Sequence, residues 1–259
     1  MKKIFIFLSI AILSSTVSAQ DSLKVLCIGN SFTYVFKTDS MLKRICNSNG
    51  HPTAVKSSYA GGMSFKRHLV SDKTIKAIER HDNNVVMLQD RSMAEAYYAH
   101  EPKRWEHALK DAQEIATRIR ANSADARIIL ERTWSYGKDN YRGFGSYEEF
   151  DRNLVVGTRL YLKAMNKALK KLGMKPMDCI SPIGDAFAIV RAERPDIVLL
   201  RSDNHHQSEF GAYLKACVNY IIIYGGTFSP ATATCDLDPQ TCKYLQDVAI
   251  RAVNQAQGK

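Results

Sequence analysis

Short apolar segments alternate along the chain with longer segments in which apolar residues recur at helical spacing. Residues 85–88 are entirely apolar, as in a buried strand, whereas residues 103–121 place apolar side chains three and four positions apart, as in a helix. This alternation predicts a parallel sheet with crossover helices. The expected strands cover residues 23–28, 53–59, 85–88 and 127–130, and the expected helices begin at residues 38 or 39, 103, 147, 184 and 208.

Three of the expected strands are followed by residues suited to a binding site. Gly29–Ser31 follows the first strand, Gly61 and Gly62 follow the second, and Gln89 and Asp90 follow the third. In an open α/β sheet, the ligand crevice lies beyond the carboxyl ends of the strands. We therefore expect these three segments to meet at one edge of the sheet.

The first 19 residues predict a secretory signal peptide. Lys2 and Lys3 precede the apolar stretch Ile4–Leu13, and Val17-Ser18-Ala19 supplies small residues for cleavage. The apolar stretch is too short to span a bilayer, and no run of some 18 apolar residues follows it. We expect export to the periplasm or the medium without stable membrane insertion, and residues 20–259 to form a single domain.

The charge balance is basic, with 36 Lys and Arg against 26 Asp and Glu and a formal net charge of +10. The cations are scattered along the chain and form no recognised nucleic-acid-binding motif. We expect a solvated basic surface and no nucleic-acid partner. The oligomeric state is left open by the sequence.

The six cysteines and the histidines show no spacing typical of a metal site, so no metal or cofactor is expected. Export makes disulfides possible. Cys235 and Cys242 are the expected pair, because both lie in a polar stretch near the C-terminus. Cys27 lies in an apolar strand and Cys217 on an apolar helix face, which favours buried packing for these two residues.

One unit of the sequence is suited to activating a serine. An alcohol is a poor nucleophile until a base takes its proton, and that base must be held in the correct tautomer. Asp203 and His206 are three residues apart, so one turn can place both side chains on the same side. We predict that His206 is the base for Ser31 and that Asp203 orients it. His205 is expected to face solvent or substrate.

A tetrahedral intermediate also needs hydrogen-bond donors for its oxyanion. The candidates are the backbone N–H groups of Ser31 and Gly62 and the side-chain amide of Gln89. Asp90 is a further candidate for substrate contact at the end of its strand.

Residues 135–147 form an insertion rich in Gly and Tyr, which follows the fourth expected strand and its end at Glu131-Arg132-Thr133-Trp134. Loops at this position often shape access to substrate. Trp134 and Tyr136 are therefore candidates for stacking on a sugar ring. The alternative is that these two side chains belong to an aromatic cluster at the edge of the core.

Together, these motifs resemble the SGNH/GDSL hydrolase superfamily over nearly the whole mature chain. The resemblance rests on Gly29-Asn30-Ser31-Phe32, Gly62 and Asp203-x-x-His206, and it is closest to a bacterial branch whose first block reads Ile-Gly-Asn-Ser-Phe. It implies a flavodoxin-like three-layer α/β/α sandwich with a mostly parallel sheet, a serine nucleophile, and ester hydrolysis without a cofactor. The chain departs from the usual pattern at Asn30, where Asp is usual, and at Gln89, which replaces the usual oxyanion asparagine.

We therefore predict a secreted carboxylic ester hydrolase that removes acetyl or other short acyl groups from carbohydrate through an acyl-enzyme on Ser31. One alternative is a lipase or thioesterase of the same fold, which would need an apolar acyl groove. The other is a non-catalytic carbohydrate-binding protein, which has no need of a complete Ser/His/Asp set.

Overall fold

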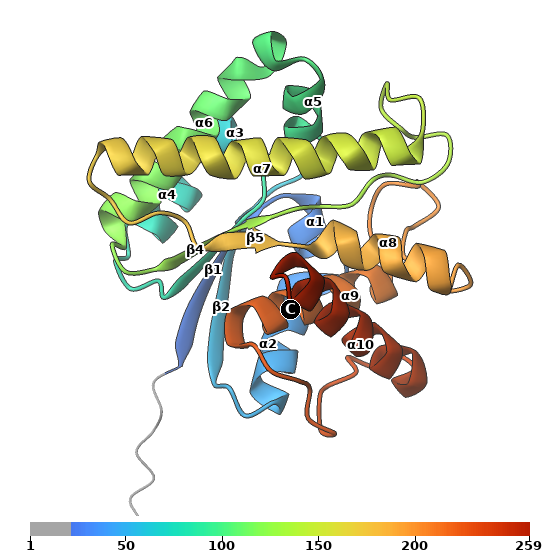
Figure 1. Ribbon diagram of the computed structural model, residues 1–259. Helices are drawn as coiled ribbons and strands as arrows, with labels where there is room; N and C mark the ends of the chain where they lie inside the picture. Colours follow the sequence, from blue (N-terminus) through green and yellow to red (C-terminus); the bar gives the residue numbers. More distant parts are fainter. Residues whose placement is uncertain (1–21) are drawn as a thin grey trace, which may run out of the picture.

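The computed structural model describes residues 22–259, so the predicted signal peptide lies outside the described residues. Within them, five strands form one parallel sheet (Figure 1). The strands are β1 (Leu23–Gly29), β2 (Thr53–Tyr59), β3 (Val85–Leu88), β4 (Arg127–Glu131) and β5 (Cys179–Ser181). Their spatial order is β2-β1-β3-β4-β5, which is the flavodoxin-like order with its switch point between β1 and β3.

The central strands are buried on both sides, which explains their continuous apolar runs. Successive side chains of a strand point to opposite faces of the sheet. In β1, Val25 and Cys27 pack into the core on one face, whereas Leu26 and Ile28 pack into the core on the other. Two separate hydrophobic cores result, one on each side of the sheet.

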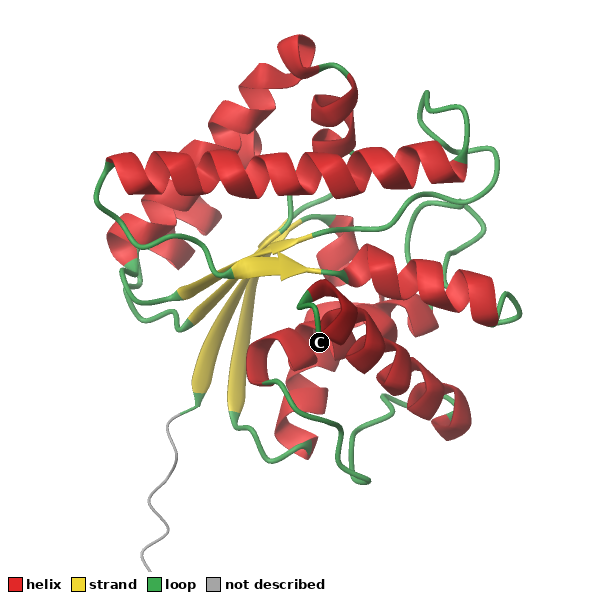
Figure 2. Ribbon diagram, in the orientation of Figure 1, coloured by secondary structure: helices red, strands yellow, loops and turns green. Residues whose placement is uncertain are grey.

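Helices cover both faces of the sheet (Figures 1 and 2). One layer contains α2 (Thr38–Ser48), α8 (Ile183–Glu193), α9 (Glu209–Tyr224) and α10 (Pro239–Ala256). The other contains α3 (Phe65–Leu69), α4 (Asp72–Ile78), α6 (Pro102–Asn122) and α7 (Tyr147–Lys171), with α5 (Ala94–His100) packed on α6 and α7. This arrangement confirms the predicted α/β/α sandwich.

Helix α9 is buried around its whole circumference from residue 211 to residue 223, because α2, α8 and α10 pack around it. A helix that is apolar on all sides is stable only in such an interior position. Its first turn is capped by the Ser208 hydroxyl, which accepts a hydrogen bond from the N–H of Gly211 at 3.1 Å. The start predicted at Ser208 is confirmed.

Several elements were not predicted from the sequence pattern, among them α3, α4, α5, α10 and β5. Strand β5 has only three residues at the sheet edge, so it leaves no periodic signal. Helix α5 is a short segment next to the longer α6. Helix α10 does carry a local signal, because Asp238 caps it and Pro239 occupies its first position.

The predicted Cys235–Cys242 disulfide is wrong, since all six cysteines are free thiols in the structure. The Cys242 side chain points toward the carbonyl of Thr234, at 3.6 Å, and both thiols are buried. The packing prediction is confirmed for Cys27 and Cys217, which are 5% and 0% exposed.

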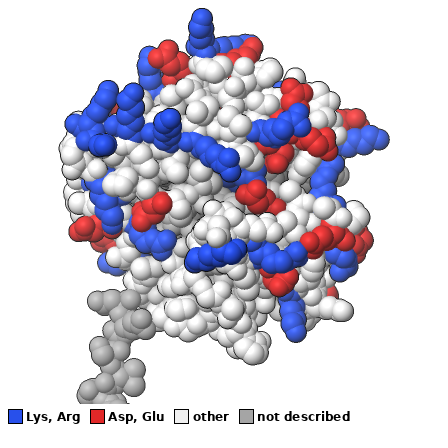
Figure 3. Space-filling model, in the orientation of Figure 1, with Lys and Arg blue, Asp and Glu red and all other residues white. Residues whose placement is uncertain are grey.

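Figure 3 shows Lys and Arg spread over one face of the molecule, with Asp and Glu side chains among them. Among residues 22–259, no helix combines the length and the apolar character needed to cross a bilayer.

Candidate active site

Ser31 is the first residue of a short helix, α1 (Ser31–Tyr34), directly after β1. The preceding Asn30 caps this helix, because its side-chain oxygen accepts the N–H of Phe32 at 3.1 Å. The Asn30 amide also donates to the carbonyls of Met63, at 3.2 Å, and Asp90, at 3.1 Å. Asn30 thus joins the segments that follow β1, β2 and β3, and this fixes the position of Ser31.

The structure brings Ser31, His206 and Asp203 into one chain of contacts. Ser31 Oγ lies 2.9 Å from His206 Nε2, and His206 Nδ1 lies 2.8 Å from Asp203 Oδ2. If the ring donates its Nδ1 proton to the carboxylate, Nε2 is left as an acceptor for the Ser31 hydroxyl. This is the arrangement that base activation of a serine requires.

Asp203 is held in its charged form. Partial burial acts to raise its pKa, but the hydrogen bonds from the His206 ring and from the N–H groups of His206 and His205 outweigh burial, and the pKa is lowered to about 2. The two backbone donors lie 2.9 and 3.0 Å from Asp203 Oδ1. An ionised carboxylate at this place stabilises an imidazolium on His206.

The loop carrying the Asp203–His206 unit is held from two directions. An isolated antiparallel bridge pairs Leu200 with Gln207 and closes the loop. The buried Gln207 amide donates to the carbonyl of Phe32 at 3.1 Å, which ties the loop to α1. On the opposite side, the Trp134 ring N–H donates to the carbonyl of His205 at 3.1 Å. These contacts fix the distance between His206 and Ser31.

Two backbone N–H groups are available in the cleft that contains Ser31. Neither the N–H of Ser31 nor that of Gly62 has a hydrogen-bond acceptor among residues 22–259. Gly62 has φ = 63°, a left-handed conformation that glycine adopts without strain. Both residues line a cleft of about 330 Å³, as do Tyr34, His205 and His206.

The predicted oxyanion role of Gln89 is contradicted by the structure. Gln89 is 1% exposed and does not line the cleft. Its amide nitrogen donates to the carbonyl of Asp90, and its side-chain oxygen accepts the N–H of Asn30 at 3.3 Å. The side chain folds back on backbone groups at the strand end, so it supports the loop instead of facing a substrate.

Comparison with known proteins bears on the fold. The sequence matches no protein-family model and no curated protein. A DUF4886 family protein from Bacteroides uniformis superposes with a TM-score of 0.66 at 22% identity, over 90% of this chain and 95% of that chain. A lipase/acylhydrolase from Enterococcus faecalis gives 0.51 at 16% identity, over 78% and 96% of the two chains. An acetyl xylan esterase from Geobacillus stearothermophilus gives 0.51 at 13% identity, over 80% and 97%.

The chain has the fold of the SGNH/GDSL hydrolases. In this SGNH/GDSL fold, the ends of β1, β2 and β3 form one edge of the sheet, and the structure places Ser31 and Gly62 there. At these sequence identities, the similarity establishes the fold only.

Two aromatic residues expected at the substrate surface of this SGNH/GDSL fold are instead in the core. Trp134 and Tyr136 are both 0% exposed. Trp134 is stacked between Phe32 and Phe187, at centroid distances of 4.2 and 4.4 Å. The prediction that they stack on a sugar is wrong, and the alternative of an aromatic core cluster is confirmed. Burial removes the large apolar surface of these rings from water, which stabilises the folded protein.

Asp90 was also expected to contact substrate, and this prediction is wrong. It is 2% exposed, and its Oδ1 accepts the N–H groups of Phe65 and Arg91, each at 2.7 Å. Burial raises its pKa to about 7, although these two hydrogen bonds oppose the rise. Asp90 therefore organises the loop after β3. His205, in contrast, lines the cleft as expected, and burial lowers its pKa to about 4, so the ring is neutral at pH 7.

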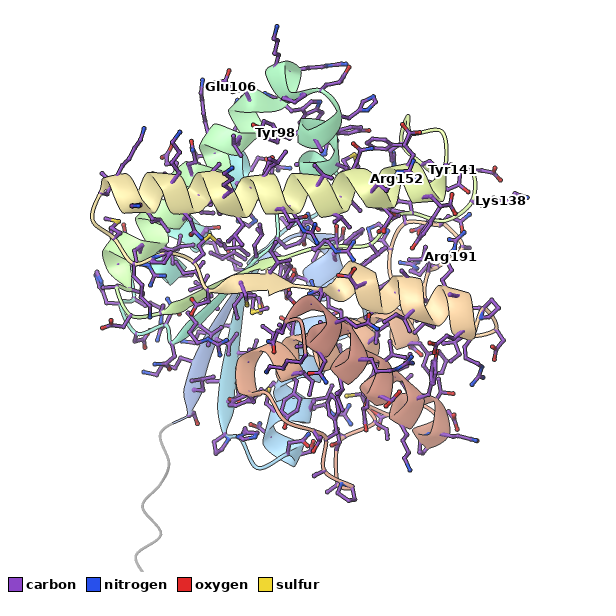
Figure 4. All side chains as sticks on the ribbon, in the orientation of Figure 1. Tyr98, Glu106, Lys138, Tyr141, Arg152 and Arg191 are labelled. Carbon is purple, nitrogen blue, oxygen red and sulfur yellow. The ribbon has the colours of Figure 1, made fainter. Side chains whose placement is uncertain are left out.

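The residue pattern did not reveal the roles of Arg91 and Arg142. Both residues line the cleft. Arg142 belongs to the loop between β4 and α7, whose other members Lys138 and Tyr141 are labelled in Figure 4. Its direction depends on how this loop folds back over the sheet edge, for which the sequence carries no local signal.

Asp203, His205 and His206 each place one ligand atom within 4.8 Å of the others, so they form a group that could hold a metal ion. Both ring nitrogens of His206 already contact protein groups, Ser31 Oγ and Asp203 Oδ2. A metal ligated by this ring would have to displace one of these contacts. We therefore interpret the group as a proton-transfer unit.

Proposed function

We propose that this protein is a carboxylic ester hydrolase with Ser31 as its nucleophile. The observation that carries the proposal is the contact chain from Asp203 through His206 to Ser31, next to the two free N–H groups of Ser31 and Gly62. The solved structures that share the fold include a lipase/acylhydrolase and an acetyl xylan esterase, which supports ester chemistry.

The first half of the reaction forms an acyl-enzyme. Ser31 Oγ bonds to the ester carbonyl carbon while His206 Nε2 accepts the hydroxyl proton, and the carbonyl π electrons move to oxygen. The N–H groups of Ser31 and Gly62 donate to this oxyanion, where one donor typically contributes about 100- to 1000-fold in rate. The carbonyl re-forms, the C–O bond to the alcohol breaks, and His206 returns the proton to the departing alkoxide.

The second half uses water in place of Ser31. The water oxygen bonds to the acyl carbon while His206 Nε2 takes a proton from this water, and the same two N–H groups donate to the new oxyanion. The bond to Ser31 Oγ then breaks, and His206 protonates this oxygen. The products are the free acid and regenerated enzyme, with Asp203 ionised throughout.

We propose that the acyl group removed is short, such as acetyl, and that it is carried on a carbohydrate. We also propose that the protein is exported, with residues 1–19 as its signal peptide. The carbohydrate part of the proposal is supported by Arg91 and Arg142, which line the cleft and suit a polar alcohol portion. The acetyl xylan esterase among the structures of the same fold also supports it.

Fluorophosphonate labelling with peptide mapping tests the nucleophile. We expect the label on Ser31, and we expect Ser31→Ala to lose both labelling and hydrolysis of 4-nitrophenyl acetate. The matched control is Ser40→Ala, because Ser40 is an exposed serine of α2 outside the cleft. Labelling at another serine, or hydrolysis that survives Ser31→Ala, would show that the assignment is wrong.

A panel of 4-nitrophenyl esters tests the acyl group. We expect kcat/KM to be highest for acetate and to fall as the acyl chain lengthens. A maximum at long chains would instead identify a lipase. Saturable glycan binding without labelling of Ser31 would identify a carbohydrate-binding protein.

A further inference from the structure

A second cavity adjoins the catalytic cleft. It has a volume of about 520 Å³, and it shares Arg91, Met93 and Arg142 with the cleft around Ser31. These shared residues place the two spaces side by side, so the second cavity neighbours an ester bound at Ser31. The two volumes together exceed what a single acetyl group fills, so the second cavity is suited to the alcohol portion of an ester.

The charged side chains of this cavity leave an excess of positive charge. Arg91, Arg104 and Arg142 face a single acidic residue, Glu101, which pairs with Arg104 at 3.1 Å. Among residues 22–259, no carboxylate lies within 4.0 Å of the guanidinium of Arg91 or Arg142. Two positive charges are therefore free to bind a ligand, and guanidinium groups bind carboxylates and sulfates in a bidentate manner.

Arg142 is held at this place by the surrounding fold. Its φ is 54°, in the left-handed region that a residue with a long side chain rarely adopts. The Tyr97 hydroxyl donates to the Arg142 carbonyl at 2.7 Å, and the Arg142 guanidinium lies 5.6 Å from the centroid of the Tyr136 ring. Unusual backbone conformations kept by surrounding contacts are concentrated at functional sites.

The remaining wall of the cavity is aromatic. Tyr97 and Trp105 stack on each other with centroids 4.7 Å apart, and both line the cavity. Both rings are only partly buried, in contrast to Trp134 and Tyr136. An apolar aromatic wall opposite guanidinium groups fits a ring with C–H faces and one anionic substituent, which is the chemistry of an acidic sugar.

We propose that the second cavity binds an acidic sugar unit, bearing a carboxylate or a sulfate, in the alcohol portion of the ester substrate. Arg91 and Arg142 bind the anionic group, and Tyr97 and Trp105 contact the sugar ring. This inference rests on the proposed function, because it assigns a substrate class to the ester bond at Ser31.

Calorimetry on Ser31→Ala tests the binding without any turnover. The ligands are an oligogalacturonide, which presents carboxylates, a sulfated xylo-oligosaccharide, and a neutral xylo-oligosaccharide of equal length. We expect at least one acidic ligand to bind about tenfold or more tightly than the neutral one, and the preference to shrink as salt is added. Whichever acidic ligand binds more tightly identifies the anion. Equal binding of all three, or no binding, would overturn the proposal.

Charge removal tests the two arginines. We expect Arg91→Gln and Arg142→Gln, each made in Ser31→Ala, to weaken binding of the acidic ligand about tenfold and that of the neutral ligand much less. The control is Arg152→Gln, because Arg152 is an exposed cation on α7 (Figure 4) and lines neither cavity. Equal losses in all three variants would overturn the proposal, because they would reflect net charge alone.

Kinetics on enzyme with Ser31 intact separate this inference from the proposed function. The substrates are acetylated oligogalacturonide and acetylated, sulfated xylo-oligosaccharide. We expect acetate release in the arginine variants to show an increased KM with kcat little changed, since the lost contact binds the ground state and the transition state equally. If no ester is hydrolysed while Ser31→Ala still binds the acidic ligand through Arg91 and Arg142, the proposed function fails and the binding site stands. If esters are hydrolysed with no preference for acidic alcohol portions, the inference fails alone.

Discussion

His68 offers a test of how the structure positions Ser31. The residue is 0% exposed, its Nε2 lies 3.0 Å from the carbonyl of Gly29, and its Nδ1 lies 2.8 Å from Thr74 Oγ1. A neutral ring donates to Gly29 and accepts from Thr74. These contacts hold the end of β1, two residues before Ser31. The change is His68→Gln, which keeps a donor and an acceptor but removes the titration.

The expected magnitude follows from the pKa of His68. Burial lowers this pKa from 6.5 to about 4, with a smaller contribution from Arg67, while the hydrogen bond to Gly29 acts in the opposite direction. As pH falls, His68 is therefore protonated in the unfolded chain before it is protonated in the folded protein. The stability contributed by the neutral ring is complete above about pH 6.5 and is lost as pH falls toward 4, and this loss amounts to about 3 kcal/mol.

Asp90 changes stability in the opposite direction over part of this range. Its pKa is raised to about 7 in the folded protein, so the folded state gains stability as pH falls below this value. The pH dependence of the wild type alone is therefore a sum of opposing effects. The difference between wild type and His68→Gln cancels the contribution of Asp90 and isolates that of His68.

Urea unfolding of both proteins between about pH 7.5 and pH 4.5 provides the measurement. At the upper end we expect His68→Gln to be less stable by about 1 kcal/mol, for imperfect hydrogen bonds. As pH falls, this difference should shrink and then reverse. Only the wild type is destabilised in this range, because its buried histidine stays neutral in the folded protein whereas the same residue is protonated in the unfolded chain. A difference that stays constant over the whole range would refute the assignment of a buried neutral ring.

Three further changes test the loop, the core and the orienting carboxylate. Asp203→Asn should reduce kcat on 4-nitrophenyl acetate by about 10⁴-fold, because it removes the charge that holds the base, and a loss below tenfold would contradict this. Lys215→Met should lower the free energy of unfolding in urea by about 3–5 kcal/mol, because it strands the Glu131 carboxylate, which lies 2.6 Å from the Lys215 ammonium in the core. Adding Glu131→Gln should recover at least half of that loss, and no recovery would exclude the charge as its cause. Trp134→Phe should destabilise the protein by about 1–3 kcal/mol, because the His205 carbonyl loses its donor and a gap opens in the stack, and thermal unfolding that matches the wild type would argue against both contacts.

Features that depend on neighbours in the sequence were predictable. The apolar runs of β1 and β3 reflect strands that are buried on both faces, and the helical period of α6 reflects a helix that is buried on one face. The spacing of Asp203 and His206 is also local, since one turn brings two residues three apart to the same side. Parallel strands end at one edge, so the encounter of Ser31 with the segment after β2 needed only the order of the elements.

The tertiary structure decided the direction of side chains in the loops. Gln89, Trp134 and Tyr136 all follow strands, yet their side chains turn into the protein, where Trp134 finds Phe32 and Phe187 from distant parts of the chain. Arg142 turns the other way, into the cleft. Composition does not distinguish these outcomes, because the preference for burial or exposure of a loop residue depends on which partners the packed core provides. The sequence by itself therefore determined the layered fold and the Ser31, His206 and Asp203 set, whereas packing between distant segments determined the walls of the cleft.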